Sequence, residues 1–403
     1  MSRAFLALAS VLVAACGSSS IDDIPSEADA GADAIEAPEE DAGITPEDAS
    51  TTEEDASPPP EQDAAPPEQD ATTPPPPEPN PKCPTSVKNP AAYTGINANP
   101  KFLQVYVNNV ENLELPTDQC HGDWKDLFYY MKLHPSPDVF LVQQISGKAQ
   151  LDELTKYMTD HLPGTFEGIV AEANPKKMGS PCGAPKAYQT NAIIYRSGRL
   201  KPVGAKETFQ VQSFRNGGCL QSLQSRTIAV MQKFHDTVAQ KNVSVASMHW
   251  GTAQGTGPDP ACAEHNVQQM ANKIEKAAFG GALMIFGGDA NESDRNSQNA
   301  YKDWYHMANG DLGGKLGYRD AIFNLCDEKS GPVKACLDDN WTGGAGGRID
   351  FLWAKRGDGC LPMMTGQHTI SYQEGDAAAK QVTGADSPYN YSGHRAIRAQ
   401  VHY

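Results

Sequence analysis

The chain has 403 residues, with 33 lysines and arginines, 50 aspartates and glutamates, and a formal net charge of −17. Residues 17–82 carry nineteen of the acidic side chains and one basic one, Lys82, and Arg3 lies before them, so residues 83–403 hold 31 residues of each sign. A formally neutral folded part excludes steering of nucleic acid by net charge. The length of residues 83–403 suits one large domain.

The N-terminus predicts export. Met1-Ser2-Arg3 precedes an apolar run over residues 4–15, which is too short to span a bilayer as a stable helix. The segment ending at Cys16 resembles the bacterial lipobox, in which the cysteine is lipidated and becomes the first mature residue. The alternative is an ordinary secretory signal that happens to end in cysteine. Because Gly17 follows rather than aspartate, we expect outer-membrane or surface display, with residues 1–16 as the lipoprotein signal peptide and Cys16 as its lipidated residue.

Residues 17–82 show no apolar periodicity and are rich in Pro, Ala, Asp and Glu. Such a segment cannot bury enough apolar surface to offset the entropy lost on ordering. Proline and charge repulsion keep it extended. We therefore predict a disordered acidic stalk between the anchor and a folded domain at 83–403. The alternative is a segment that binds a cation or a basic partner.

Eight cysteines follow Cys16, and an even number in an exported domain favours disulfides over metal binding. Cys326 and Cys336 bracket a short polar loop and are predicted to pair. The sequence leaves the remaining connectivity open. The other six cysteines are Cys83, Cys120, Cys182, Cys219, Cys262 and Cys360.

Apolar runs alternate with helical patterns along residues 83–403, which indicates mixed sheets covered by helices. Leu151, Leu154, Met158 and Leu162 fall near a 3.6-residue spacing, and residues 267–279 show the same pattern. The predicted strands are Phe102–Val107, Asp138–Val142, Ala192–Tyr195, Thr227–Met231, Val243–Met248, Leu283–Phe286, Ile349–Trp353 and Ala396–Val401.

Polar residues mark the ends of several of these strands. Asn109 ends the first strand, and His249 ends the strand from Val243. Gly288-Asp289-Ala290-Asn291 follows the strand from Leu283, and a two-residue spacing on an extended segment points Asp289 and Asn291 the same way. The rim of a sheet can hold such groups rigidly without burying them unpaired. For each one alone, a turn or structural role is the alternative.

Two further clusters lie near the C-terminus. Asp350 stands at the start of the strand that ends at Trp353, and His394 precedes the last strand. An aspartate beside a histidine can fix the tautomer of the ring, as in a catalytic triad without its serine. For Asp350, the alternative is a residue at a strand start that is capped by Arg348.

The order and spacing of these clusters resemble the catalytic core of the endonuclease/exonuclease/phosphatase family, the metal-dependent phosphoesterases related to DNase I. The resemblance covers residues 100–403. It implies an α/β four-layer sandwich, in which two mixed β-sheets pack face to face with helices outside. It also implies a divalent cofactor, Mg²⁺ or Mn²⁺.

The resemblance also implies the role of each residue. Asp289 accepts a proton from the attacking water, and His249 donates one to the leaving oxygen or stabilises the transition state. Asp350 orients His394. Of the remaining positions, Asn109 and Asn291 contact phosphate, and Gln144 stands at the position of the principal metal ligand.

Three positions depart from the family pattern. Gln144 and Gly393 replace two acidic residues, and neither a neutral amide nor a glycine holds a strongly hydrated ion well. Gln189 replaces a glutamate of the nuclease branch and can only orient the histidine ring. Two functions remain. One is a phosphoesterase with weaker or relocated metal binding, or with acid–base chemistry from histidines and aspartates. The other is an inactive member that binds a phosphate-bearing ligand or a surface partner.

The substrate stays open between nucleic acid, phospholipid head groups and other phosphate esters. A nuclease would line its cleft with basic or aromatic side chains. Lys176-Lys177, Arg196, Arg199 and Arg215 are candidates, with scattered surface charge as the alternative. We expect a monomer in the bacterial cell envelope that contacts the membrane through its lipid anchor only.

Overall fold

The computed structural model describes residue 83 and residues 89–110, 131–175, 189–251, 261–329, 331–343, 347–370, 392 and 394–403. The predicted signal peptide 1–16 with Cys16, the stalk 17–82, Lys176-Lys177 and Gly393 lie outside these residues. Within the described part of the chain, no helix is long and apolar enough to cross a membrane.

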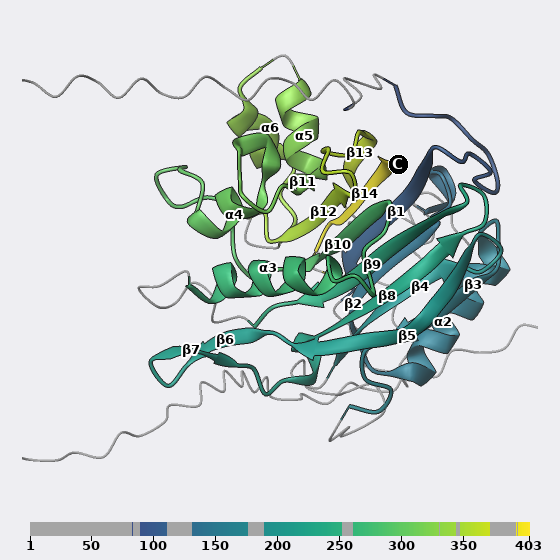
Figure 1. The fold of residues 1–403 in the computed structure, drawn as a ribbon, viewed down its shortest axis with the longest axis horizontal. Helices are drawn as coiled ribbons and strands as arrows, with labels where there is room; N and C mark the ends of the chain where they lie inside the picture. The colour runs from purple at the N-terminus through teal and green to yellow at the C-terminus, as the bar shows by residue number, and fades with distance from the viewer. Residues whose placement is uncertain are drawn as a thin grey trace, which may run out of the picture. The chain divides into compact units, whose positions relative to one another are not determined.

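Six strands form the first sheet, in the order β13-β14-β1-β2-β4-β3 (Figure 1). β1 and β2 run parallel, and the other neighbouring strands run antiparallel. Every residue of β1, β2 and β4 is buried, as expected for strands that are covered on both faces. In chain order, the strands are β1 Phe102–Asn109, β2 Val139–Ile145, β3 Phe166–Val170, β4 Thr190–Arg196, β13 Met364–Ile370 and β14 Ala396–His402.

The second sheet also has six strands, in the order β11-β12-β10-β9-β8-β5. β9 and β10 are its parallel pair, and the other neighbours are antiparallel. The strands are β5 Leu200–Gln210, β8 Ile228–Asp236, β9 Lys241–His249, β10 Leu283–Asp289, β11 Arg319–Asp320 and β12 Asp350–Arg356. A separate hairpin, β6 Gln212–Arg215 and β7 Gly218–Gln221, lies between β5 and β8 in the chain.

The two sheets pack face to face through apolar side chains of both. Leu103, Val105 and Leu141 of the first sheet share one buried cluster with Val245 and Ile285 of the second. Polar bonds also join the sheets, because the Ser247 hydroxyl donates to the Val142 carbonyl oxygen at 3.0 Å. The predicted α/β fold, two mixed sheets face to face with helices outside, is therefore confirmed.

Helices lie outside the sheets (Figure 1). The predicted helical spacing is confirmed in α2, where Leu151, Leu154 and Met158 pack in one buried cluster with Phe140 and Ile194 of the first sheet. Residues 267–274 of the second pattern lie in α3, and Phe279 follows the end of that helix. The helices are α2 Lys148–His161, α3 Ala261–Ile274, α4 Asp303–Ala308, α5 Ala321–Glu328 and α6 Val333–Asp339, with short 3-10 turns at Ser225–Thr227 and Gly310–Leu312.

Three disulfides join segments of the described part. The predicted Cys326–Cys336 bond is confirmed and links α5 to α6. Cys219–Cys262 ties the β6–β7 hairpin to α3, and Cys83–Cys360 ties the start of the domain to the loop after β12. Disulfides persist in oxidising compartments, so these bonds indicate a location outside the cytoplasm.

Candidate active site

The register of the second sheet places three predicted site residues in one row. Asp289, the last residue of β10, lies opposite His249 of β9 on one side and opposite Asp350 of β12 on the other. Neighbouring strands lie about 4.8 Å apart, so side chains in one row can reach each other. The ends of three strands thus bring two carboxylates and an imidazole to one rim of the sandwich.

The close approach of β9 and β10 depends on Gly288. Its φ is +146°, and a Cβ atom built there would lie 1.8 Å from the Met248 carbonyl oxygen. Such contacts with backbone cannot be relieved by a side-chain movement. Gly288 is therefore the residue that allows Asp289 to stand beside His249.

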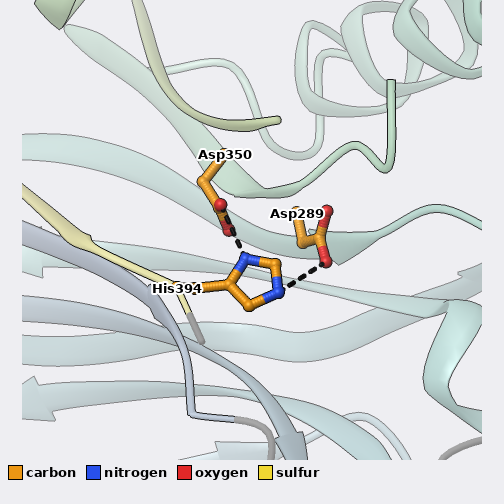
Figure 2. Close-up of side chains that lie close together, drawn as sticks. All are labelled: Asp289, Asp350 and His394. Carbon is orange, nitrogen blue, oxygen red and sulfur yellow. Dashed lines mark hydrogen bonds and ion pairs between the residues drawn. The ribbon is translucent and has the colours of Figure 1, made fainter. Parts of the chain in front are cut away.

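His394 enters this row from the first sheet, just before β14 (Figure 2). Its Nδ1 atom lies 2.8 Å from Asp350 Oδ2, and its Nε2 atom lies 3.7 Å from Asp289 Oδ2. Ser392 holds the segment, because its hydroxyl accepts from the His394 amide at 3.0 Å and donates to the Asn109 carbonyl oxygen at 2.5 Å. One imidazole thus bridges two carboxylates from the opposite sheet.

Asp289 lies at the centre of the cluster and is 1% exposed. Its Oδ2 atom accepts from Asn109 Nδ2 at 3.0 Å and lies 3.5 Å from His249 Nε2. Burial raises the pKa of this carboxyl group, Asp350 raises it further, and the two histidines oppose the shift. A buried carboxylate with a raised pKa is a suitable proton acceptor.

Thr342 holds the backbone at Asp350, whereas Arg348 pairs with Asp294 and Asp320. The Thr342 hydroxyl accepts from the backbone amides of Ile349 and Asp350 at 3.0 and 2.9 Å. The Thr342 carbonyl oxygen accepts from the Arg395 amide at 2.8 Å. One residue therefore braces both partners of the Asp350–His394 pair, and no sequence motif pointed to it.

Three amides form a hydrogen-bonded chain beside Asp289. Asn109 Nδ2 donates to Gln144 Oε1 at 2.7 Å, and Gln144 Nε2 donates to Gln189 Oε1 at 2.6 Å. Gln144 is 2% exposed and has a positive φ of 59°. Its oxygen and its nitrogen both bond to neighbouring amides, so its geometry does not favour the predicted role as a metal ligand. The Gln189 side-chain oxygen accepts this bond from Gln144.

Asn291 differs from its expected orientation. The backbone amide of Asn291 donates to Asp289 Oδ1 at 2.7 Å, and φ at Asn291 is +48°. The segment is therefore a tight turn closed by the aspartate, not an extended strand that points both side chains the same way. The Asn291 side-chain amide donates to the Trp250 carbonyl oxygen at 2.8 Å, which fixes the end of β9.

Arg226 is a charged neighbour that sequence reasoning missed. It lies in the turn before β8 and is 7% exposed, and its Nε atom donates to Gln224 Oε1 at 2.7 Å. Burial lowers the pKa of its guanidinium, and the charge of Asp289 raises it. A buried arginine this close to the cluster can offset the negative charge of a phosphate. Only the folded structure distinguishes it from a surface arginine.

Two of the predicted cationic candidates have structural roles instead. Arg196 and Arg199 are buried and form ion pairs with Asp138, and Arg199 also pairs with Asp236. Gln189 precedes β4 and belongs to the amide chain at the site, whereas Arg196 is the last residue of that strand. The arginine–aspartate ion pairs therefore lie at the opposite end of β4 from the site. Arg215 lies on the β6–β7 hairpin and donates to a backbone carbonyl oxygen there.

A divalent cation fits part of the cluster. Asp289, Asp350 and His394 each offer a ligand atom, and these atoms all lie within 4.8 Å of one another. Carboxylate oxygens suit Mg²⁺ and Mn²⁺, and imidazole is tolerated better by Mn²⁺. Asp350 holds the other nitrogen of the ring, which is the usual way a ligating histidine is oriented.

No protein-family model matches the sequence, and no curated protein is significantly similar to it. Solved structures with a similar fold include an endonuclease/exonuclease/phosphatase from Bacteroides vulgatus, at 15% identity and a TM-score of 0.47, covering 74% of this chain and 98% of that one. D. rerio TDP2 complexed with a single-strand DNA product shows 16% identity and a TM-score of 0.46, over 74% of this chain and 98% of that one.

A third similar structure is a mannosyl-6-phosphatase from Bacteroides thetaiotaomicron, at 16% identity and a TM-score of 0.46, covering 75% of this chain and 100% of that one. Likeness at this level concerns the fold, so the chemistry is argued from the residues of the site. The chain is similar in fold to proteins of the endonuclease/exonuclease/phosphatase type.

Proposed function

We propose that the domain hydrolyses phosphodiesters at the cluster of His249, Asp289, Asp350 and His394. The observation that supports this most is that a buried carboxylate, Asp289, lies between the Nε2 atoms of two histidines, at 3.5 and 3.7 Å. Phosphodiester cleavage needs a proton acceptor for water and a proton donor for the leaving oxygen, and this arrangement supplies both.

The roles follow from the contacts. Asp289 takes a proton from the attacking water while the water oxygen bonds to phosphorus. His249 donates a proton to the leaving oxygen as its bond to phosphorus breaks. Asp350 keeps the proton of His394 on Nδ1, so Nε2 faces the reacting group. The His394 side chain is 10% exposed, against 0% for His249, so the substrate reaches the cluster from the His394 side.

Arg226 would offset the negative charge of the phosphate, and Asn109 positions Asp289 through its hydrogen bond at 3.0 Å. A divalent ion, Mg²⁺ or Mn²⁺, would be held by Asp289, Asp350 and His394 and would supply Lewis-acid stabilisation of the phosphoryl oxygens. The protein groups perform the proton transfers.

The proposed setting is the outside of a bacterial cell. The disulfides support a location outside the cytoplasm, and the lipobox-like segment supports lipidation at Cys16 and display at the outer membrane. In this proposal, the acidic segment 17–82 is the stalk that separates a monomeric catalytic domain from the membrane.

A second candidate is a binding protein without turnover. The observation that favours it is the amide chain, in which Gln144 bonds to Asn109 and Gln189 instead of offering a carboxylate. In that case the cluster binds a phosphate-bearing ligand. Restoring both acids with Gln144→Glu and Gly393→Asp would then create metal-dependent turnover that the natural chain lacks. This candidate fails if the natural chain is already as active as the double variant.

The experiment that tests hydrolysis uses the full chain and bis-para-nitrophenyl phosphate as a generic phosphodiester. We expect release of para-nitrophenol by the natural chain. With a dinucleotide, whose alkoxide leaving group needs a proton, we expect a loss of about 10²–10⁴-fold in His249→Ala, because the proton donor is removed. His235→Ala is the matched control, since this half-buried histidine lies on β8 and its Nδ1 atom lies 3.2 Å from Asn242 Oδ1, away from the cluster. Equal rates on the dinucleotide for the natural chain and His249→Ala would refute the assignment.

A further inference from the structure

A cavity of about 490 Å³ lies at the end of the domain opposite the candidate active site. Two strands connect the two places. β1 begins at Phe102, which lines the cavity, and ends at Asn109 in the site. β14 begins two residues after His394 and ends at His402, which lines the cavity. A molecule bound in this cavity is therefore separate from a substrate at the catalytic cluster.

The inner wall of the cavity is aromatic. Phe102 is fully buried, and the centroid of its ring lies 5.4 Å from that of His402. Burial, and then the charge of Lys101, lower the pKa of His402 to about 4, so this ring is neutral at physiological pH and adds no cation. The ring of Tyr403 also lines the cavity, and its hydroxyl is fixed by donating to Asp236 Oδ2 at 2.7 Å. Flat walls of this kind suit a flat apolar ligand.

Two lysines that line the cavity form no ion pair within the described part of the chain. Lys101 precedes β1, Lys241 begins β9, and both are exposed. Lys241 Nζ lies 5.0 Å from the centroid of the Tyr403 ring, so this cation stands beside the aromatic wall. Neither lysine pairs with the carboxylate at Tyr403, the last residue of the sequence, and no acidic side chain lines the cavity. The cavity therefore offers two positive charges to an anion.

An amide adds an uncharged donor to this lining. Asn99 Oδ1 accepts from the Lys101 backbone amide at 2.9 Å, and the Asn99 carbonyl oxygen accepts from Arg199 at 3.0 Å. The side-chain oxygen of Asn99 is therefore occupied, while its Nδ2 group forms no hydrogen bond with the described residues. Lysine and amide nitrogens donate only, so the part of a ligand that they contact must carry acceptors. A carboxylate offers two such oxygens and the negative charge.

We propose that this space, which we call the Lys101–Lys241 cavity, binds a small organic carboxylate with a flat apolar body. Its volume lies within the range of about 300–1,000 Å³ that is usual for small-molecule sites. The aromatic wall contacts the apolar body, and the two lysines and Asn99 contact the carboxylate. The inference is independent of the proposed hydrolysis, because the cavity shares no residue with the catalytic cluster.

The test is titration calorimetry of the full chain with 2-naphthoate as the probe. We expect Lys101→Gln and Lys241→Gln each to weaken binding about 5-fold, which is the upper range for an exposed pair of charges. Both lysines are exposed, so these substitutions do not disturb the core. Lys101→Arg and Lys241→Arg keep the charge and should bind within about 2-fold of the natural chain.

Two further ligands separate the charge from the apolar body. The neutral 2-naphthamide keeps the rings and loses the charge, whereas acetate keeps the carboxylate and loses the rings. Each should bind at least about 5-fold more weakly than 2-naphthoate, because each lacks one of the two matching parts.

Lys156→Gln is the matched control, since this exposed lysine lies on α2 and pairs with Asp160 away from the cavity. It makes the same change in net charge and should leave the affinity unchanged. Arg226→Gln tests whether the carboxylate binds at the catalytic cluster instead, and it should also leave the affinity unchanged.

Weaker binding in both lysine variants, with unchanged binding in Lys156→Gln and Arg226→Gln, supports the cavity. The proposal is overturned if the natural chain does not bind 2-naphthoate, or if the two lysine variants bind it like the natural chain. It is also overturned if 2-naphthamide or acetate binds as tightly as 2-naphthoate, or if Arg226→Gln weakens binding and the lysine variants do not.

Discussion

His394 Nδ1 lies 2.8 Å from Asp350 Oδ2, although the two residues come from different sheets. This contact fixes one ring nitrogen, so the other faces Asp289 at the centre of the cluster. It joins the two halves of the sandwich at the rim where the proposed chemistry takes place (Figure 2).

Replacing Asp350 with asparagine should lower kcat strongly without unfolding the protein. The amide keeps the size of the carboxylate but favours the wrong ring tautomer and gives no charge to a protonated His394. We expect a loss of about 10²–10⁴-fold in kcat for the aryl phosphodiester. Asp358→Asn, at an exposed aspartate paired with Arg356, is the control and should keep the parental rate. A rate for Asp350→Asn equal to that of this control would contradict the orienting role.

The rate should depend on the ionisation of Asp289. Burial raises the pKa of this carboxyl group, and the group must be ionised to accept a proton. The value of kcat/KM should therefore fall on acidification at a pH above the ordinary range for aspartate. A pH–rate profile with the aryl diester measures this, because that substrate has no group that titrates nearby. An acid limb at the ordinary aspartate pKa would contradict the prediction.

The raised pKa of Asp289 also determines how the free energy of unfolding changes with pH. The folded state binds the Asp289 proton more tightly than the unfolded state, so unfolding releases a proton. The contribution of this group to the free energy of unfolding is fully present below the unfolded pKa, and it is lost as pH rises through the folded pKa. Urea unfolding of the parent and Asp289→Asn across that range should show the parent losing stability relative to the variant as pH rises.

Gln144→Glu should create a stronger cation site. The new carboxylate would replace the neutral amide that now bonds to Asn109 and Gln189. A charged oxygen ligand holds Mg²⁺ or Mn²⁺ better than an amide. Titration calorimetry with Mn²⁺ should show an affinity at least about 10-fold higher than that of the natural chain. Gln221→Glu, at an exposed residue of β7, is the control for added charge. Equal Mn²⁺ affinity for Gln144→Glu and the natural chain would contradict this account.

Gly288→Ala should destabilise the fold and misplace Asp289. The added methyl group would lie 1.8 Å from the Met248 carbonyl oxygen, at a φ of +146°. We expect the free energy of unfolding to fall by about 3 kcal/mol or more. Gly198→Ala, where nothing lies within 4 Å, should change it by less than about 0.5 kcal/mol. Urea unfolding of both variants compares the two, and similar losses would refute the close-approach argument.

Strong apolar runs in the sequence predicted the strands that carry the site, with shifts at their ends. β2 begins at Val139 because Asp138 is held in the buried pairs with Arg196 and Arg199. Thr227 lies in a 3-10 turn rather than in β8, since its hydroxyl donates to the Gln224 carbonyl oxygen at 2.7 Å. The first residues of these two strands depend on contacts with other parts of the fold, which the local sequence does not show.

Other strands had no local signal. β13 contains threonine, glycine, glutamine and histidine, and its register shifts between Thr365 and His368, so it lacks the alternation that marks a strand. Most of β5 is exposed, and its middle has few apolar residues. The hydrogen bonds of the neighbouring strands β14 and β8 hold these segments in the sheets.

The sequence predicted those site residues that stand at the ends of apolar strands. His249, Asp289, Asp350 and His394 could be grouped in this way, and the structure brings them together. Arg226 and Thr342 could not, because a buried arginine and a bracing hydroxyl look like ordinary surface and turn residues in the sequence. The turn at Asn291 was also hidden, since the choice between an extended segment and a positive φ is made by the Asp289 carboxylate.

The most direct test of the proposed site is hydrolysis of bis-para-nitrophenyl phosphate by the full natural chain beside Asp289→Ala, each with Mg²⁺, with Mn²⁺ and with chelator. The account predicts turnover by the natural chain in at least one of these conditions. It also predicts that Asp289→Ala lowers that rate by at least about 100-fold, because the proton acceptor is lost. Equal rates for the two chains in all three conditions would contradict it.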